Sequence, residues 1–292
     1  MSLELRPAVL GAEGEPATVH RPDWAVNRVL VGDCLSQMAG LPARSVHLVL
    51  CDLPYGTTNN AWDSVIDLGA LWQAYERVLA PDGVVVLTGQ GPFTARLLLS
   101  REAWFRYKLC WVKSKATNFL NAKKQPLRRY EDVLVFTPAG VGRYFPQMQP
   151  GAAYDKGVRK DQQTGSYNDM QPARVKTDGG RYPTDVVYFK TAESEGPVWH
   201  PTQKPVALGR YLVRTYSRPG EVVLDNACGS GSFLVAALSE GRNYVGIELN
   251  KATRQFRRDD VDLVAVSQER LRATWAELPD RQRSWVMPDG PR

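Results

Sequence analysis

Between residues 221 and 233 the chain reads Glu221-Val-Val-Leu-Asp225-Asn-Ala-Cys-Gly229-Ser-Gly231-Ser-Phe233. A short apolar run ends in an acid, a glycine-rich turn follows, and a helical pattern begins at once. Glycine adds no Cβ, so backbone N–H groups in such a turn can approach a ligand closely at the start of the helix. The stretch therefore predicts a strand–turn–helix unit of an α/β fold, with a ligand at the turn.

A second acid indicates what kind of ligand this turn binds. The next apolar run ends in Gly246-Ile-Glu248-Leu-Asn. An acid at the end of the following strand can accept hydrogen bonds from both ribose hydroxyls of a nucleoside cofactor. The third glycine of a dinucleotide-binding turn is absent near Leu234. We expect an adenosine-containing ligand; the alternative is a tight turn with an unrelated acid.

Apolar runs alternate with helical patterns over most of the chain, which predicts an α/β fold built on a mostly parallel, doubly wound sheet. The expected strands are Arg28–Gly32, Val46–Cys51, Gly83–Thr88, Tyr107–Val112, Asp132–Phe136, Asp185–Phe189, Glu221–Leu224 and Asn243–Ile247. The expected helices are Leu68–Leu79, Pro205–Tyr216 and Ser232–Ser239, with a further helix in the last thirty residues.

The segment from Gly140 to Pro183 interrupts this alternation, because it has hardly any apolar period. A loop this long inside a compact domain is usually functional or disordered. Its aromatic content favours function, since it carries Tyr144, Phe145, Tyr154, Tyr167 and Tyr182. We interpret it as an inserted recognition segment.

Composition restricts the class of protein. The 292 residues are 43% hydrophobic and 23% charged, which excludes wholesale disorder. No apolar run approaches the roughly 20 residues of a membrane span, and residues 1–19 do not resemble a signal peptide, so a cytoplasmic protein is expected. The four cysteines are widely spaced and the three histidines are scattered. We expect buried reduced thiols and no metal site.

The net charge of +6 is unevenly distributed. Residues 101–129 contain nine Lys and Arg against Glu102 alone. So one-sided a stretch suggests a polyanionic partner, most simply nucleic acid, with a solvated basic face as the alternative.

A further motif, Asp52-Leu-Pro-Tyr55, directly follows the expected strand at 46–51. It places a carboxylate, a proline without an N–H donor and an aromatic ring at a carboxyl end of a strand, where α/β proteins bind ligands. Another strand ends in Gly32-Asp33-Cys34, and His200-Pro-Thr-Gln-Lys-Pro205 forms a rigid entry into a helix.

Together these motifs resemble the amino-group DNA methyltransferases. Residues 52–55 resemble the catalytic [DNS]-P-P-[YFW] motif, residues 200–205 the tenth motif, and residues 225–233 the first. Their order is that of the circularly permuted β class, and residues 119–126 and 131–136 also resemble phage and prophage methylases. Leu53 replaces the first proline of the catalytic motif. Asn226 and Ala227 replace proline and phenylalanine, and Ser232 replaces threonine.

The resemblance implies the fold of S-adenosylmethionine-dependent methyltransferases in five parts. These are an N-terminal arm (1–25), a catalytic half (26–140), a target-recognition insert (141–185), a cofactor-binding half (186–260) and a C-terminal helix and tail (261–292). The implied partner is double-stranded DNA, and a cognate restriction endonuclease and a homodimer are left open.

The resemblance also assigns residues. The catalytic residues are Asp52, Leu53, Pro54 and Tyr55. Those for S-adenosylmethionine are Asp33, Cys34, Asp52, His200, Thr202, Lys204, Asp225, Asn226, Ala227, Gly229, Ser230, Gly231, Ser232, Phe233, Glu248 and Leu249. The basic residues Lys113, Lys115, Lys123, Lys124, Arg128 and Arg129 are assigned to DNA. Lys204 is expected near the methionine carboxylate, Asp33 at the adenine amino group and Glu248 at the ribose.

The implied mechanism needs no covalent enzyme intermediate. Asp52 would accept one hydrogen of an exocyclic amine and the Leu53 carbonyl the other, while Tyr55 stacks on a base flipped out of the helix. Asp at the head of the motif favours N6 of adenine by family tendency, with N4 of cytosine as the alternative.

Three other classes of protein fit fewer of these features. A nicotinamide-dependent oxidoreductase would explain the unit from Gly229 to Glu248 but not Asp52–Tyr55. A non-catalytic DNA-binding protein would explain the charge but gives Asp52 no role. A methyltransferase acting on RNA or protein is disfavoured by the permuted order and the long insert.

Overall fold

The computed structural model describes residues 26–56, 65–138, 140, 142–158, 174–199, 202–250 and 261–286. The chain divides into two compact units. Residues 15–145 and 185–292 belong to the larger unit, and residues 1–14 and 146–184 to the smaller. The five parts expected from the sequence assign roles, which this division does not test, so they remain predictions.

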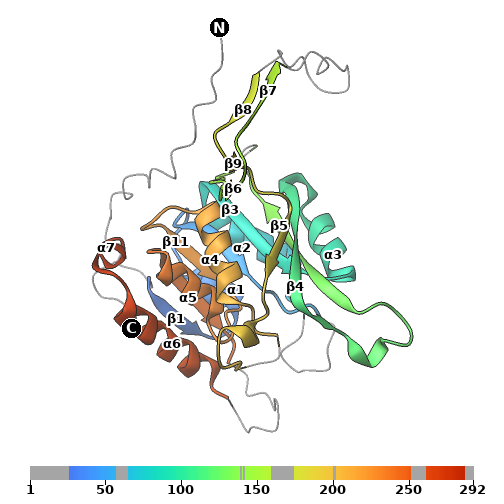
Figure 1. The fold of residues 1–292 in the computed structure, drawn as a ribbon. Coiled ribbons are helices and arrows are strands. Elements are labelled where there is room, and N and C mark those ends of the chain that lie inside the picture. The colour runs from blue at the N-terminus through green and yellow to red at the C-terminus, as the bar shows by residue number, and fades with distance from the viewer. Residues whose placement is uncertain are drawn as a thin grey trace. The chain divides into compact units, whose positions relative to one another are not determined.

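An eight-stranded sheet forms the centre of the larger unit (Figure 1). Its strands in spatial order are β1 (Arg28–Val31), β12 (Asn243–Glu248), β11 (Val222–Asp225), β2 (Val46–Cys51), β3 (Leu79–Gly89), β5 (Arg128–Phe136), β4 (Phe105–Thr117) and β10 (Val186–Phe189). Only β5 runs antiparallel to its neighbours. The predicted mostly parallel sheet is confirmed, and each predicted strand has its counterpart.

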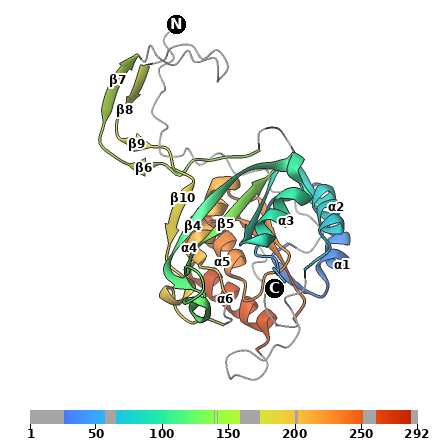
Figure 2. The same cartoon turned by 90° about the vertical axis from the view of Figure 1, so that its right-hand side faces the viewer.

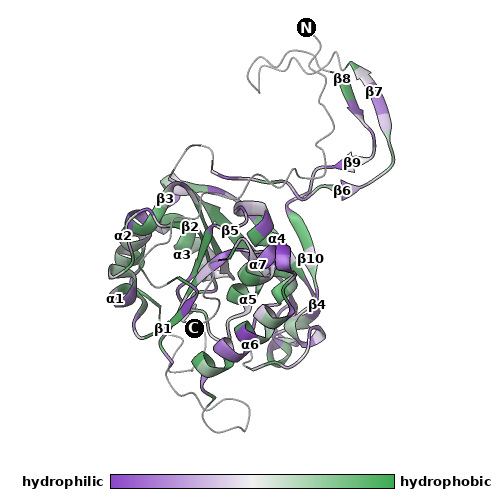
Figure 3. Cartoon of the chain, turned by 90° about the vertical axis from the view of Figure 1, so that its left-hand side faces the viewer, coloured by the Kyte–Doolittle hydropathy of each residue, from purple (hydrophilic) through white to green (hydrophobic). Residues whose placement is uncertain are grey.

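Helices cover both faces of this sheet (Figure 2). The α-helices are α1 (Cys34–Ala39), α2 (Leu68–Val78), α3 (Pro92–Ser100), α4 (Val206–Tyr216), α5 (Ser232–Ser239), α6 (Leu263–Glu277) and α7 (Asp280–Arg283). Short 3₁₀ turns lie at η1 (Glu102–Trp104), η2 (Phe119–Asn121) and η3 (Ala192–Ser194). Apolar residues of α4, α5 and α6 pack in one core, and those of α1, α2 and α3 in a second core on the opposite face. Figure 3 shows the hydrophobic strands between these layers.

The sequence explains the ends of α2. Asp67 caps its first turn, accepting a hydrogen bond of 2.7 Å from the Ala70 N–H. Apolar side chains at Leu71, Trp72, Tyr75 and Val78 then face the core at helical spacing. The helix ends one residue before the predicted end, and β3 begins at once with Leu79. Residues 81–82, which precede the expected start of the strand at Gly83–Thr88, also belong to β3, where a register shift against β2 accommodates them.

β1, the first strand in the described part of the chain, lies at one edge of the sheet, beside the last described strand, β12. β1 pairs in parallel with β12, Val29 lying opposite Gly246. The Asn27 amide donates to the Asn243 side chain at 3.0 Å, and both residues are buried. The edge strand is therefore fastened by side chains as well as by its backbone.

The smaller unit contains two antiparallel strand pairs. β6 (Gln149–Pro150) pairs with β9 (Gly180–Arg181), and β7 (Tyr154–Val158) pairs with β8 (Arg174–Thr177). An Arg174–Asp155 ion pair at 2.5 Å joins the second pair, and the Arg181 guanidinium lies 4.5 Å from the Tyr154 ring centre. Polar and cation–π contacts thus connect the strands of this segment, which explains its lack of apolar period.

No helix in the described ranges is long and apolar enough to cross a bilayer. All four cysteines are free, and three are buried while Cys110 is half-buried.

Candidate active site

The fold brings two acidic motifs together at the edge of the sheet that the carboxyl ends of the parallel strands form, at the centre of that edge. β11 and β2 are parallel neighbours, with Val223 opposite Leu48. Asp225 is the last residue of β11, and Asp52 directly follows β2. The chain continues from β11 to β12 on one side and from β2 to β3 on the other, so the strand order reverses here. Open α/β sheets bind ligands in the crevice at such a point.

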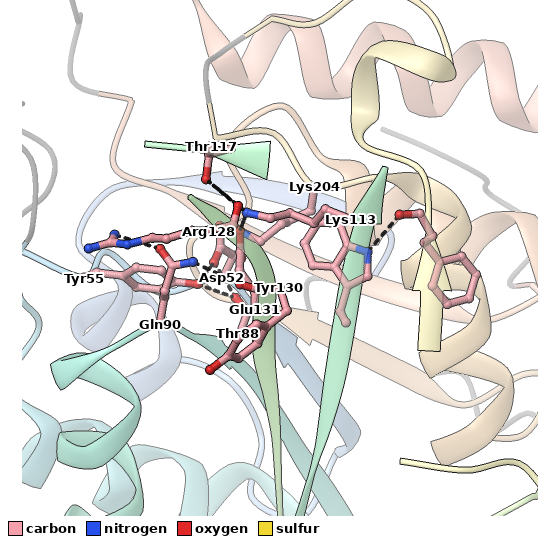
Figure 4. Close-up of polar contacts among 12 residues, drawn as sticks. Asp52, Tyr55, Thr88, Gln90, Lys113, Thr117, Arg128, Tyr130, Glu131 and Lys204 are labelled. Atoms are coloured by element: carbon pink, nitrogen blue, oxygen red, sulfur yellow. Dashed lines mark hydrogen bonds and ion pairs between the residues drawn. The ribbon is translucent and has the colours of Figure 1, made fainter. Parts of the chain in front are cut away.

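Asp52 is held through both carboxylate oxygens (Figure 4). Its Oδ1 accepts hydrogen bonds from the Tyr55 hydroxyl at 2.8 Å and from the Thr88 hydroxyl. Its Oδ2 accepts from the Lys204 ammonium at 2.5 Å. Three donors from separate parts of the chain, the loop after β2, strand β3 and the loop before α4, therefore orient the carboxylate.

Lys204 joins Asp52 to a second acid, and both acids are half-buried. Its Nζ lies 3.3 Å from Glu131 of β5, and Glu131 also pairs with Lys113 of β4 at 3.1 Å. The charges alternate in sign along this row, and both lysine side chains are buried. Burial raises the pKa of Glu131, but Lys204 and Lys113 outweigh it and the pKa is lowered. Burial likewise opposes charge on Lys204, while Asp52 and Glu131 raise its pKa above the ordinary value. Glu131 and Lys204 are therefore both ionised.

Tyr55 is fixed by contacts on its ring and on its hydroxyl. Its ring stacks on Phe93 of α3, with centres 4.8 Å apart and planes at 27°. Burial, with Asp52 and Glu131 nearby, raises the pKa of Tyr55 well above its usual value. The hydroxyl therefore stays protonated and donates to Asp52.

The glycine turn after β11 has the geometry that its sequence predicts. Gly229 and Gly231 have φ of 51° and 78°, in the left-handed region that favours glycine. The Gly229 N–H donates to Oε2 of Glu248 at 2.8 Å, and the Asn250 N–H donates to Oε1 at 3.1 Å. Glu248 thus ties the end of β12 to the turn, and its oxygens retain lone pairs for a hydroxyl donor.

Asp225 is buried between the other two acids. Its pKa is raised to about 7: burial is the largest cause, repulsion from Asp52 and Glu248 adds to the rise, and the Cys51 thiol and the Ala227 N–H oppose it. Three acids therefore act on one another at this edge. Such a site favours a ligand that carries positive charge.

Comparison with known proteins identifies the family. A family model described as DNA methylase, covering N6 and N4 methyltransferases, matches residues 46–256. The chain belongs to this DNA methylase family. The DNA adenine methyltransferase YhdJ of Escherichia coli (strain K12) is 27% identical over 240 residues, which are 76% of this chain and 78% of that protein. The prediction of an amino-group DNA methyltransferase is confirmed.

Two solved structures share the fold of this methylase. The complex of M1.HpyAVI with SAM is 18% identical, with a TM-score of 0.55 over 84% of this chain and 98% of that one. The PvuII DNA methyltransferase, described as cytosine-N4-specific, is 15% identical, with a TM-score of 0.57 over 89% and 90% of the two chains. At these identities the likeness concerns the fold alone.

The other residues that were assigned to the cofactor have different surroundings in the methylase. Asp33 is exposed and caps α1, accepting from the Ser36 N–H at 2.9 Å. The buried Asn226 accepts from the Tyr75 hydroxyl at 2.6 Å. Cys34 and Phe233 lie in the core, whereas Thr202 and Leu249 are exposed. His200 lies outside the described residues.

Two polar residues missed by the sequence analysis support the glycine turn. The Ser230 hydroxyl donates to Gln203 at 3.0 Å. Arg270 of α6 donates to the Ser230 carbonyl at 2.5 Å and lies 3.3 Å from the Ser232 hydroxyl. A cavity of about 690 Å³ opens here, with Trp199, Gln203 and Arg270 in its wall. Gln203 lies inside the motif at residues 200–205, whereas no sequence pattern around Arg270 indicates a role at the site.

The structure separates the six basic residues that were assigned to DNA. Lys115, Lys123, Lys124, Arg128 and Arg129 are exposed. Lys113 is buried in the ionic row described above. An ammonium in that position is unavailable to a phosphate. The structure therefore argues against Lys113 as a DNA contact and gives it a structural role.

Proposed function

We propose that this methylase transfers the methyl group of S-adenosylmethionine to N6 of adenine in double-stranded DNA. The observation that carries the proposal is the position of Asp52. Its oriented carboxylate lies at the strand-order reversal, beside the glycine turn and the acids Asp225 and Glu248.

The residues around the turn fit S-adenosylmethionine. The cofactor would lie over Gly229, with the Glu248 carboxylate accepting from ribose hydroxyls and Asp33 at the adenine amino group. The mutual repulsion of Asp52, Asp225 and Glu248 would be relieved by a cationic ligand. When bound, S-adenosylmethionine supplies an electrophilic methyl group on a sulfonium.

Asp52 has capacity for the acceptor amine. An ionised carboxylate offers roughly four acceptor sites. Among the described residues, Tyr55 and Thr88 donate to Oδ1 and Lys204 donates to Oδ2. One site on Oδ2 is therefore available to an amino hydrogen, while the Leu53 carbonyl would accept the second. The nitrogen lone pair then turns out of the ring plane, and Asp52 is placed to take the proton that the amine releases.

DNA recognition would involve the inserted segment. Its β7–β8 pair is an antiparallel two-stranded ribbon, a shape that a major groove admits. Residues 141–185 would read bases, whereas exposed lysines and arginines of the larger unit would bind phosphates. The aspartate that begins the catalytic motif and the adenine specificity of the relative YhdJ support adenine as the target.

The test is product analysis. The purified protein is incubated with unmethylated duplex DNA and methyl-labelled S-adenosylmethionine, and the DNA is digested to nucleosides for mass spectrometry. N6-methyladenine is expected. N4-methylcytosine would overturn the target base alone, and absence of label in DNA would overturn the proposed function.

Two variants separate donor from acceptor. Asp52→Ala should abolish methyl transfer in a single-turnover assay while leaving cofactor affinity near that of the wild type. Glu248→Ala should weaken S-adenosylmethionine binding in calorimetry by about tenfold or more, because charge-assisted hydrogen bonds are lost. Normal turnover of the first variant, or unchanged affinity of the second, would contradict these assignments.

A further inference from the structure

The β4–β5 hairpin extends far beyond the level of the catalytic residues. Leu109 of β4 lies, through Val133 of β5, in register with Thr88, which donates to Asp52. From Leu109 the strand continues to Thr117, which at about 3.3 Å per residue is roughly 25 Å of strand. Because β4 runs parallel to β2 and β3, this extension points toward the edge that carries Asp52. We call residues 114–130 the hairpin arm; it lies at the lower right of Figure 1.

The hairpin arm carries positive charge without any acidic residue. Its basic residues are Lys115, Lys123, Lys124, Arg128 and Arg129, all of them exposed. No Asp or Glu occurs from Ser114 to Tyr130. The arm is therefore complementary to a polyanion, and an extension of this length can span a DNA groove, about 12 Å wide for the major groove.

The tip of the hairpin arm has a defined backbone that turns two apolar side chains outward. Asn118 takes the left-handed conformation, with φ of 74°, and accepts a side-chain hydrogen bond of 2.8 Å from Asn121. The 3₁₀ turn η2 follows, and the Lys124 N–H donates to the Asn121 carbonyl at 2.8 Å. Phe119 is 67% exposed and Leu120 fully exposed. A preformed turn thus presents a phenylalanine and a leucine, side by side in sequence, on a basic arm.

We infer that Phe119 and Leu120 insert between stacked bases of duplex DNA while the lysines and arginines of the hairpin arm bind the flanking phosphates. The inference rests on the proposed function and deepens it. Apolar wedges of this kind unstack base steps and kink the duplex. A base that reaches Asp52 must leave its stack, and unstacking at the same sheet edge lowers the cost of that step. The charge of the arm selects nucleic acid over a second copy of this positively charged chain.

The test compares two labelled duplexes of identical mixed sequence, one fully paired and one with a single central mismatch. A wedge has less stacking to break at a mismatch, so the wild type should bind the mismatched duplex more tightly in fluorescence anisotropy, by about tenfold. Phe119→Ala/Leu120→Ala should lose this preference and keep the salt dependence of binding. The matched control, Lys123→Ala/Lys124→Ala, should keep the preference, weaken binding to both duplexes and flatten the salt dependence.

The outcomes discriminate between the inference and the proposed function. The exposed side chains at 119 and 120 support no core, so thermal unfolding of the double variant should match the wild type. Absence of a mismatch preference in the wild type, or its persistence in Phe119→Ala/Leu120→Ala, would overturn the wedge. A change of oligomeric state with unchanged DNA affinity would make the tip a protein contact and also overturn it. If the preference is lost as expected but no methyl group reaches DNA, the wedge stands and the proposed function fails.

Discussion

Lys113 and Lys115 are two positions apart in one strand and have different surroundings. Lys113 is buried against Glu131, whereas Lys115 is exposed at the start of the hairpin arm. Sequence alone placed both in one basic stretch, because neither Glu131 nor Lys204 is near them along the chain.

A pair of substitutions tests this difference. Lys113→Met should lower the free energy of unfolding by about 1–3 kcal/mol, since Glu131 loses one of two buried partners. Its DNA binding should keep the salt dependence of the wild type. Lys115→Ala should leave stability within about 0.5 kcal/mol and reduce the slope of log affinity against log salt by about one. Urea unfolding and salt titrations measure both; equal effects of the two variants would contradict the structural assignment.

Asp225 makes stability depend on pH. Burial raises its pKa to about 7, against about 3.9 in an unfolded chain. The folded state therefore binds the proton more tightly, so this contribution to stability is fully present below about pH 4 and is lost as pH rises through 7. The loss is at most about 4 kcal/mol. The Asp225→Asn variant lacks this titrating carboxyl. Between pH 4.5 and 8, without cofactor, the wild type should therefore lose a few kcal/mol of unfolding free energy relative to the variant. Parallel pH profiles would contradict the raised pKa.

Local motifs revealed the acids of the site but not their partners. Asp225 and Glu248 each end a strand and Asp52 directly follows one, all within recognisable sequence patterns. The ion pair of Asp52 with Lys204 joins positions that only the finished sheet brings together, and Thr88 and Arg270 belong to no motif. Lys204 was expected near the methionine carboxylate of the cofactor, because residues 200–205 resemble a cofactor-binding motif. In the structure it pairs with Asp52, which belongs to the catalytic motif.

At the scale of elements, the glycine turn before α5 is constrained in two ways. Gly231 caps α5 with positive φ, and a Cβ there would lie 2.8 Å from the Cβ of Ser267 in α6. Gly91 caps α3 with φ of 57°, but a Cβ there would meet nothing within 4 Å. The two positions also differ in backbone: Gly231, with ψ of 23°, is left-handed, whereas Gly91, with ψ of −130°, has a conformation that is essentially restricted to glycine.

Alanine substitutions at these two caps should therefore have unequal effects. Gly91→Ala should lower the free energy of unfolding through its backbone alone, by more than the roughly 1–2 kcal/mol of a left-handed residue, and should leave cofactor binding unchanged. Gly231→Ala should cost about 1–2 kcal/mol for its left-handed backbone plus the cost of shifting α6, and should weaken cofactor binding at the adjoining turn. Chemical unfolding and calorimetry compare the two variants; unchanged cofactor affinity of Gly231→Ala would mean that the contact with Ser267 is relieved without disturbing the turn.

Element prediction succeeded where burial leaves a pattern. The strands carry near-continuous Val, Leu and Ile, since helices cover both faces of the sheet. The short α1 was missed because its six residues span too few turns to show a period. The strands β6 to β9 were missed because cation–π and ionic contacts, which have no period along the chain, connect them.

At the scale of the whole molecule, the division into two units predicts that the larger unit folds without residues 146–184. Replacement of residues 146–184 by a short Gly-Ser linker should leave a cooperative thermal transition and cofactor affinity close to those of the wild type, because none of the described residues of this segment belongs to the cores of the larger unit. Site-selective methylation should be lost while residual DNA binding through the hairpin arm remains. Retained site selectivity, read by sequencing methylated DNA, would show that the insert does not read bases.

The pairing of β1 with β12 also orders events in time during synthesis. β1 ends at Val31, and β12 is complete only at Glu248. A ribosome that adds about 5–20 residues per second needs roughly 10–40 s to cover that interval. Throughout this interval β1 has no neighbouring strand to pair with, and Asn27 lacks its hydrogen-bond partner Asn243. The nascent chain therefore carries Asp52 long before it can close the sheet, and a newly made molecule becomes competent only after Glu248 has been added.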